Sequence, residues 1–194
     1  RFILAHHRPL KQGKPLVAPI TYGNWGGTHA DVHLSNIRDI LRERLPMDYY
    51  WIDAGWYGKP EPEELPTWAT NVGDWRVKSC LHPQGFRMLS DVLHREGREL
   101  MLWFEPERVY RNTPWHRGHA DWLIDIGNDN LLMDLGKPEA RAFVTNFIGD
   151  RAAEFGLGCY RQDFNMDPGP YWDRNDAPDR QGMSEIRYIE GLYA

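Results

Sequence analysis

The sequence lacks any apolar segment long enough to cross a membrane, and it contains few cysteines. The longest uninterrupted apolar run, residues 100–104, has five residues, whereas a membrane-spanning helix needs about 20. Two cysteines, Cys80 and Cys159, are too few for a disulfide scaffold and have no metal-ligand spacing. They favour a reducing compartment, and no signal-peptide pattern opens the chain. We therefore expect a cytoplasmic protein with no membrane partner.

Positive charge and cofactor motifs are also scarce. The chain carries 23 basic and 28 acidic residues, a net charge of −5, which argues against nucleic acid as the main partner. It contains no Gly-rich dinucleotide loop and no Gly-Lys-Ser/Thr phosphate loop. The histidine pairs His29/His33 and His116/His119 stand in no His-Glu-x-x-His context. We expect solvated histidines, no metal and no organic cofactor.

Aromatic residues are plentiful. They make up 13% of a 194-residue chain that is 41% hydrophobic, and nine of them are Trp. This length and composition suit one globular domain with a sizeable core. Many of the rings stand beside carboxylates and glycines, and a large flat ring suits the apolar face of a sugar as well as a core. A share of them is expected to fill the core.

Short β-like runs alternate with helical patterns along the chain. Strands are expected at residues 17–22, 49–52, 100–104, 131–135 and 158–163. Helices are expected from residue 28 or 31 to 45, from 86 to 97, from 138 to 156, and from 185 onward. Thr28 or Asp31 is the candidate cap of the first helix, and Ser184 that of the last. Residues 59–66 and 108–130 are expected to form long loops.

An acidic or Trp residue follows each expected strand. Strand and helix in alternation imply an α/β fold with parallel strands and right-handed crossovers. A (β/α)₈ TIM barrel gathers the ends of all its strands on one face and places its active site there. A complete barrel takes about 250 residues, so we interpret residues 1–194 as its first half or slightly more. The remainder is expected from a longer chain or from a partner chain.

The densest group of chemically active residues lies at 160–165. Asp163, at a strand end, has Arg161 and Asn165 two residues away on either side. The positive charge of Arg161 favours the ionised form of Asp163, and the Asn165 amide can hydrogen-bond a substrate hydroxyl. Asp163 is therefore a candidate nucleophile. The alternative is that Asp163 caps a loop or pairs with Arg161.

A second group is Glu105 and Glu107, which flank a proline directly after an apolar strand. The proline restricts the backbone and splays the two carboxylates. One carboxylate is then able to reach a ligand while the other anchors the loop. The alternative is that both are structural and pair with Arg108 or Arg111.

A third group begins at Asp53. This residue ends a strand and is followed by Gly55 and Trp56, an arrangement suited to binding two adjacent sugar hydroxyls beside an aromatic wall. Asp74 and Trp75 repeat the combination in a loop. For that pair an ordinary turn is the favoured alternative.

Five motifs resemble, in order and spacing, the catalytic barrel of family 36 glycoside hydrolases, which are α-galactosidases with some α-N-acetylgalactosaminidases. The resemblance runs from about Tyr22 to the end of the chain. The motifs are Trp51-Ile-Asp-Ala-Gly-Trp56, Gly73-Asp74-Trp75, Leu102-Trp-Phe-Glu-Pro-Glu107, Leu132-Met-Asp-Leu135 and Tyr160-Arg-Gln-Asp-Phe-Asn165.

The resemblance implies roles for six residues. Asp163 matches the nucleophile at the end of the fourth strand, Asn165 matches the Asn of that motif, and Arg161 its Lys. Trp103 and Trp25 match tryptophans that line the sugar pocket. Asp53 matches the first of two aspartates that bind galactose hydroxyls. Residues 131–135 then belong to an excursion after the third strand.

The sequence departs from the family pattern at positions that are expected to bind the hydroxyl groups of the sugar. Ala54 replaces the second aspartate, Arg161 the lysine and Gln162 a tryptophan. No sugar-binding arginine precedes residues 131–135, because residues 128–130 read Asn-Asp-Asn. The family's acid/base aspartate lies on a later strand than this sequence includes. These changes leave the exact sugar open.

Two functions follow. The first is a retaining α-glycosidase that hydrolyses terminal α-galactosides or related sugars through a covalent glycosyl-enzyme on Asp163, with no cofactor. Its partner is a glycoside or oligosaccharide substrate, and a homo-oligomer stays open. The second is a non-catalytic carbohydrate-binding barrel fragment that lacks its acid/base.

Overall fold

The computed structural model describes residues 10–11, 13–61 and 68–194. Four strands form one parallel sheet in the order β3-β4-β5-β9. They are β3 (Thr21–Asn24), β4 (Tyr49–Ile52), β5 (Glu99–Phe104) and β9 (Leu157–Gln162). The order of these strands in the sheet is the same as their order along the chain, as in a (β/α)₈ barrel. The α/β class and the parallel sheet are confirmed.

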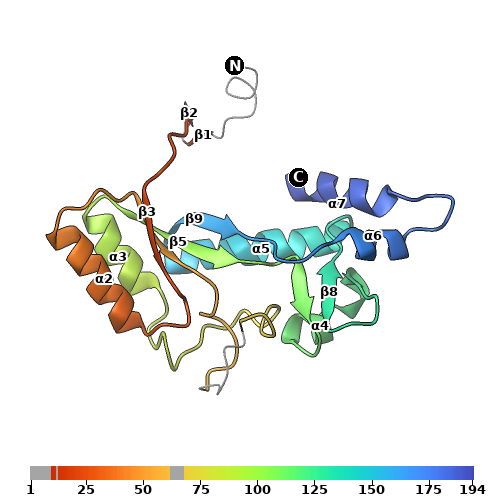
Figure 1. Ribbon diagram of the computed structural model, residues 1–194, viewed down its shortest axis with the longest axis horizontal. Coiled ribbons are helices and arrows are strands. Elements are labelled where there is room, and N and C mark those ends of the chain that lie inside the picture. Colours follow the sequence, from red (N-terminus) through yellow and green to blue (C-terminus); the bar gives the residue numbers. More distant parts are fainter. Residues whose placement is uncertain (1–9, 12, 62–67) are drawn as a thin grey trace.

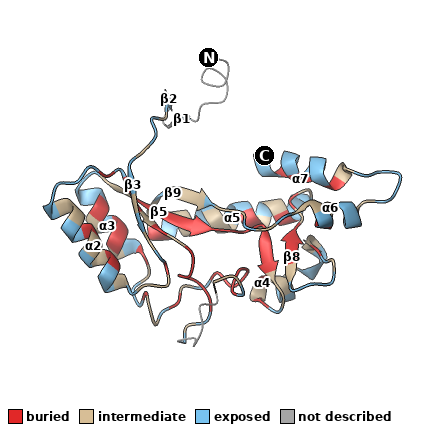
Figure 2. Ribbon diagram, in the orientation of Figure 1, coloured by how far each residue is buried: buried red, intermediate tan, exposed pale blue. Residues whose placement is uncertain are grey.

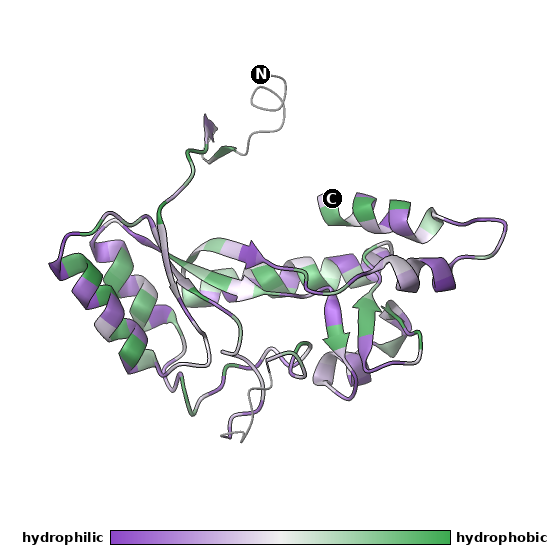
Figure 3. Ribbon diagram, viewed as in Figure 1, coloured by the Kyte–Doolittle hydropathy of each residue, from purple (hydrophilic) through white to green (hydrophobic). Residues whose placement is uncertain are grey.

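Three helices pack on this sheet or on one another. They are α2 (Ala30–Arg42), α3 (Arg87–Arg95) and α5 (Pro138–Phe155). Figure 1 shows α2 beside α3, while α3 contacts β5 and α5 contacts β9. Figure 3 shows hydrophobic and hydrophilic residues alternating along α2, as expected of a helix with one face against the core. None of the helices in the described residues is long and apolar enough to cross a membrane.

Helix α5 shows how local sequence sets its own bounds. Pro138 occupies the first helical turn, where its missing N–H costs nothing. Gly156 ends the helix with φ 67°, a left-handed conformation that glycine adopts without strain. Both features were expected. Helix α3 likewise ends just before Gly97, which has φ 65°.

The expected N-caps were wrong at two helices. Neither Thr28 nor Asp31 caps α2, which starts after His29 without a side-chain cap, and the N–H of Ala30 donates to the carbonyl of Leu81 (3.0 Å). The last helix, α7 (Met183–Tyr193), starts after Gly182. Ser184 lies inside its first turn. Ser184 donates from its backbone N–H (3.0 Å) and its hydroxyl (2.7 Å) to the carboxylate of Asp176.

The first strand of the sheet is shorter than expected. Residues 17–20 lie outside β3, and Val17 and Ile20 are 73% and 47% exposed. The apolar run has no neighbouring strand before Thr21, which pairs with Tyr49. The Ile20 N–H instead donates to the Asp48 carboxylate (2.8 Å).

Residues 108–130 are folded rather than an open loop. They contribute to a small antiparallel sheet in the order β6-β8-β7, with a short helix beside it. Its elements are β6 (Arg108–Tyr110), α4 (Pro114–Gly118), the 3-10 turn η1 (Ala120–Trp122), β7 (Leu123–Ile124) and β8 (Asn130–Met133). The strand expected at residues 131–135 is β8, and it belongs to this excursion as the resemblance implied.

The remaining elements lie outside both sheets. They are the hairpin β1 (Leu10–Lys11) and β2 (Lys14–Pro15), and the helix α6 (Gly169–Asn175) that precedes α7. The hairpin stands away from the sheet in Figure 1. Of the loop expected at residues 59–66, positions 62–66 lie outside the described residues.

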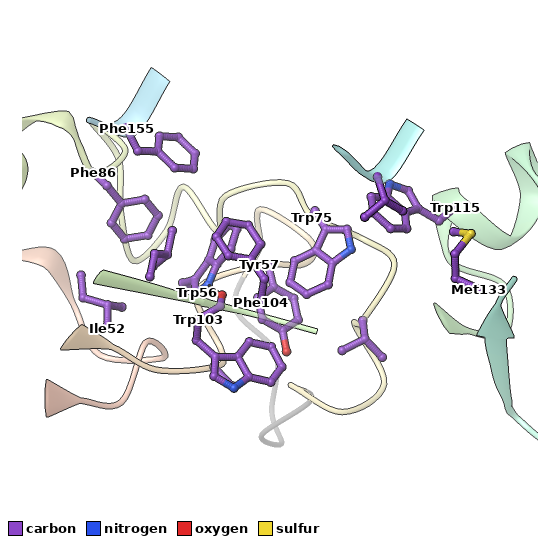
Figure 4. Packing of buried hydrophobic residues seen from close by; sticks show 14 of the residues in the cluster. Ile52, Trp56, Tyr57, Trp75, Phe86, Trp103, Phe104, Trp115, Met133 and Phe155 are labelled. Atoms are coloured by element: carbon purple, nitrogen blue, oxygen red, sulfur yellow. Dashed lines mark hydrogen bonds between the residues drawn. The ribbon is translucent and has the colours of Figure 1, made fainter. Parts of the chain in front are cut away.

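The core lies on the helix side of the parallel sheet. Strand β5 is almost wholly buried, as Figure 2 shows. Figure 4 places Phe86 and Phe155 on one side of this strand and Trp103 on the other. Trp56, Phe86 and Phe104 are fully buried, so a large part of the aromatic content does fill the core.

Among the described residues, the end strands β3 and β9 pair on one side only. The sheet is therefore an open arc that corresponds to part of a (β/α)₈ barrel.

Candidate functional site

The C-terminal ends of the parallel strands bring the predicted residues to one edge of the sheet. The backbone hydrogen bonding between neighbouring strands continues for one residue beyond β4 and β9. The Asp53 N–H donates to the Asn24 carbonyl (2.9 Å), and the Asp163 N–H donates to the Phe104 carbonyl (3.1 Å). These bonds fix the backbone of both acidic residues. Trp25, Asp53 and Asp163 thus each follow a strand of the same sheet.

Asp163 has a partly exposed carboxylate with one direct hydrogen bond. Trp103 donates from Nε1 to Oδ2 of Asp163 (3.0 Å), and the Trp103 side chain is itself 1% exposed. The Asp163 side chain is 38% exposed. Its Oδ1 accepts no hydrogen bond from the described part of the chain. A carboxylate held by one oxygen and open at the other suits a nucleophile.

Arg161 lies close to Asp163 but does not make a tight ion pair with it. Its Nη2 is 3.7 Å from Asp163 Oδ2, too long for a good hydrogen bond. The guanidinium carbon lies 4.6 Å from the centre of the Trp51 ring, a cation–π arrangement. The alternative that Asp163 pairs with Arg161 therefore holds only as a loose contact.

Asn165 connects the Asp163 loop to the end of β5. Its backbone N–H donates to Glu105 Oε1 (2.6 Å), and its side-chain amide donates to the Asp163 carbonyl (3.1 Å). The amide nitrogen thus stabilises the turn that follows Asp163. The side-chain oxygen of Asn165 remains the group available to a substrate hydroxyl.

Glu105 is structural, which was the alternative interpretation of this residue. It is fully buried and forms a two-point ion pair with Arg108, Nε to Oε1 at 3.0 Å and Nη2 to Oε2 at 2.6 Å. Such a paired arrangement offsets part of the cost of burying both charges. Arg111, the other expected partner, binds Asp125 instead.

Glu107 differs from Glu105 because it has no basic partner in the described part of the chain. It is 1% exposed, its Oε1 accepts a hydrogen bond from Gln162 Nε2, and its Oε2 has no hydrogen-bond partner there. Burial raises the pKa of Glu107 to about 7. It lies on the helix side of the sheet with Tyr160 and Val144, and the negative charges of Glu105 and Asp163 contribute further to its raised pKa.

Trp25 and Asp53 line one depression on the open side of the sheet. Thr21, Gly23, Asn24 and Trp51 complete its lining. Trp25 is 39% exposed, so part of its indole is accessible from this depression. Asp53 accepts a hydrogen bond from the Ala54 N–H (2.7 Å) through Oδ1. Ala54 itself is buried.

One aromatic residue near these groups was not predicted. Trp68 lies in the connection between β4 and α3, with its ring centre 6.4 Å from that of Trp25 and 6.0 Å from that of Trp103. It follows a stretch rich in Pro and Glu that is typical of an ordinary loop. No periodicity in the sequence marks it, because its neighbours come from distant strands.

The histidines do not behave as expected throughout. His33 is fully buried rather than solvated, and its ring stacks on that of His82 with centres 5.7 Å apart. The core accepts it because Tyr50 offers a hydrogen-bond partner. Within the described residues, no three His, Cys, Asp or Glu side chains lie together in a group able to hold a metal ion.

Comparison with known proteins agrees with this architecture. A parallel sheet with acidic residues at its carboxyl edge is the arrangement of (β/α)₈ enzymes. The family model described as Melibiase matches residues 4–194. The chain therefore belongs to the melibiase family.

Curated relatives carry α-galactosidase names. The α-galactosidase Mel36A of Lactobacillus acidophilus is 23% identical over 98% of this chain and 27% of its own length. The α-galactosidase AgaA of Geobacillus stearothermophilus is 26% identical over 90% of this chain and 25% of its own. The solved GH36 α-galactosidase AgaB of Geobacillus stearothermophilus has a TM-score of 0.71 at 23% identity, over 91% of this chain and 25% of that one. The chain thus spans about a quarter of the length of these relatives.

Proposed function

We propose that this protein is a retaining α-glycosidase that hydrolyses terminal α-galactosides or closely related sugars, with Asp163 as its nucleophile. The observation that carries this proposal is the Asp163 carboxylate at the end of β9. One of its oxygens is held by the Trp103 indole and the other is open. Membership of the melibiase family supports the substrate class. Residues 1–194 then form part of the catalytic barrel.

In this mechanism, Oδ1 of Asp163 attacks the anomeric carbon and the glycosidic bond to the leaving group breaks. A covalent glycosyl-enzyme forms, and water then hydrolyses it. A second carboxylic acid about 5–5.5 Å away protonates the leaving oxygen and later activates the water. The resemblance puts that acid/base on a later strand of the barrel, which this sequence does not include. We do not assign the acid to Glu107, because its carboxylate lies on the helix side of the sheet with Tyr160 and Val144.

The remaining predicted residues bind the sugar in this proposal. Trp25 contacts an apolar sugar face, while Asp53, Arg161 and Asn165 bind hydroxyls. Trp103 was expected to line the sugar pocket, but its ring is 1% exposed, so it acts by holding the Asp163 carboxylate. Solved variants of AgaA, 26% and 25% identical to this chain, are described in complex with raffinose and stachyose. By analogy, we propose oligosaccharides with a terminal α-galactose as substrates.

The direct test is the Asp163→Ala variant of the full-length protein. We expect turnover of an aryl α-galactoside to fall by at least about 10⁴-fold, since the covalent intermediate no longer forms. Added azide or formate is expected to restore part of the activity, because a small anion fills the space of the lost carboxylate. The matched control is Asp173→Ala, which removes an exposed carboxylate on α6 and is expected to leave turnover unchanged.

Two results separate this proposal from its alternatives. Near wild-type hydrolysis by Asp163→Ala contradicts the assignment of the nucleophile. A wild-type protein that binds α-galactosides but turns none over supports a carbohydrate-binding function instead.

A further inference from the structure

Trp68 is only half-buried, although it lies among aromatic residues that are closed off from solvent. Trp103 and Tyr57, its neighbours in the fold, are 1% and 0% exposed. Its ring meets the Trp25 and Trp103 rings at nearly right angles, with interplanar angles of 88° and 87°. Trp68 therefore lies between a partly exposed indole and the indole that holds the Asp163 carboxylate.

Two contacts hold Trp68 in this position, and each partner is itself fixed by a further contact. The guanidinium carbon of Arg108 lies 5.3 Å from the centre of the Trp68 ring. Arg108 is itself fixed by its two-point ion pair with Glu105. The Tyr57 hydroxyl donates to the Trp68 carbonyl (3.0 Å), and the Tyr57 ring stacks on Trp103 with centres 5.7 Å apart. The ring is thus oriented before any ligand arrives, so its ordering cost is already met in folding.

We propose that Trp68 is a specificity-determining residue of the sugar site and that its exposed ring surface contacts the apolar C–H face of a bound glycoside. This inference rests on the proposed function. Trp25 and Trp68 then form two aromatic walls of the site, and the connection between β4 and α3 supplies the second of them. Trp103, which is 1% exposed, holds the Asp163 carboxylate behind them. The Arg108 guanidinium acts through Trp68 by fixing the orientation of its ring.

Four variants of the full-length protein test this proposal: Trp68→Phe, Trp68→Leu, Trp68→Ala and Trp122→Leu. Phe keeps a flat aromatic face, Leu keeps apolar bulk without one, and Ala removes both. Trp122, which stacks on His119 in the antiparallel excursion, is the matched control outside the proposed site. Each variant is assayed for kcat and KM on p-nitrophenyl α-galactoside and on raffinose, together with its Tm.

We expect KM to rise about tenfold or more in Trp68→Leu and Trp68→Ala on at least one substrate, with a smaller change in kcat. Trp68→Phe is expected to recover most of the wild-type KM, and Trp122→Leu to leave both parameters unchanged. Trp68→Leu distinguishes contact with sugar from mere packing, because an apolar side chain restores packing but offers no flat π face.

Two outcomes overturn the inference. Unchanged KM on both substrates in Trp68→Leu and Trp68→Ala shows that the ring contacts no sugar. Wild-type KM in Trp68→Leu, with a raised KM and a lowered Tm in Trp68→Ala only, shows that Trp68 is a packing residue. In either case the proposed function stands if the wild type is active and Asp163→Ala is not. A wild type that neither hydrolyses nor binds an α-galactoside overturns both proposals.

Discussion

At the scale of single residues, His33 and His82 form a stacked pair under strong desolvation. Nδ1 of His33 and the Tyr50 hydroxyl are hydrogen-bonded (3.2 Å), and Nε2 of His82 donates to the Gly26 carbonyl (2.8 Å). Burial lowers the pKa of His33 to about 4, with a further contribution from the neighbouring His82. Gly26 directly follows Trp25, so the pair supports the loop that carries this indole.

His33 predicts a loss of stability in acid. Its pKa is about 4 in the folded protein, against 6.5 for an unperturbed histidine. The contribution of neutral His33 to the free energy of unfolding is therefore complete above pH 6.5 and is lost as the pH falls toward 4. In that range the unfolded chain binds a proton at this histidine that the folded chain excludes. The effect is on the order of 3 kcal/mol across this range.

This prediction is checked by urea unfolding of the wild type and of His33→Asn at about pH 7 and about pH 4.5, on either side of the unfolded-state pKa. Asn keeps a polar atom near the Tyr50 hydroxyl but does not titrate in this range. The wild type is expected to lose more stability between the two pH values than the variant. Equal losses in the two proteins count against it.

Ala54 predicts a tolerant sugar pocket. Where the resemblance expects a second carboxylate, this buried methyl group offers no hydrogen bond. A site without a partner for a hydroxyl discriminates weakly against analogues that lack it. We expect the full-length protein to lose about 10- to 100-fold less kcat/KM on deoxy or pentopyranoside analogues than a relative with two aspartates. An equally steep loss in the two enzymes contradicts the prediction.

At the scale of elements, one glycine lies inside α5 and another ends it. Replacing each by alanine is expected to change the stability of the protein in opposite directions. Gly156 has φ 67°, and a Cβ at this position would lie 3.3 Å from Ser90 Cβ. Gly156→Ala is therefore expected to cost about 1–2 kcal/mol. Gly149, inside α5, has open space around its missing Cβ, and Gly149→Ala is expected to stabilise by about 0.5–1 kcal/mol.

The pair of variants is compared by chemical denaturation at one pH. Both variants add one methyl group at the same helix, one inside it and one at its left-handed C-cap. Destabilisation by Gly149→Ala, or none by Gly156→Ala, would show that the backbone conformation does not decide these positions.

The elements also show where sequence reasoning works. Strand β4 was predicted with its observed bounds, and the start and end of α5 follow from Pro138 and Gly156. These features depend on short-range backbone preferences. The caps of α2 and α7 were wrong because their partners, Leu81 and Asp176, lie elsewhere in the fold.

The same distinction applies to the candidate site. Asp53 and Asp163 could be predicted because strand ends in a parallel sheet meet at one edge. The sequence left open whether Glu105 binds a ligand or pairs with Arg108. Only the distances between the guanidinium nitrogens and the carboxylate oxygens show that it forms the ion pair. Trp68 could not be predicted, since no local pattern shows that a loop residue lies between rings from β5 and from the loop after β3.

At the scale of the whole molecule, the parallel sheet has two strands that pair on one side only among the described residues, β3 and β9. Unpaired strand edges favour association with other chains. Helix α7 adds an exposed apolar stripe of Ile186, Ile189 and Tyr193. These three side chains are spaced as one face of a helix.

We expect the isolated 194-residue chain to be marginally stable, to associate as its concentration rises, and to be inactive. Removing a general acid alone costs about 10²–10⁴-fold, and missing walls of the site cost more through lost positioning. Sedimentation at several concentrations and an assay on an activated aryl α-galactoside measure both effects. A monodisperse monomer that turns over like the full-length protein contradicts this expectation.

The buried ion pair between Glu105 and Arg108 has a consequence for engineering. One carboxylate accepts the Asn165 N–H, and the guanidinium bound to it packs on Trp68. A loop graft that replaces residues 59–70 to alter substrate choice would therefore remove the aromatic neighbour of Arg108. The Arg108 guanidinium is bound to Glu105, whose carboxylate holds the turn after Asp163. Grafts that keep a planar side chain at position 68 are the ones expected to preserve that turn, so a library of this loop should hold position 68 aromatic and vary the residues around it.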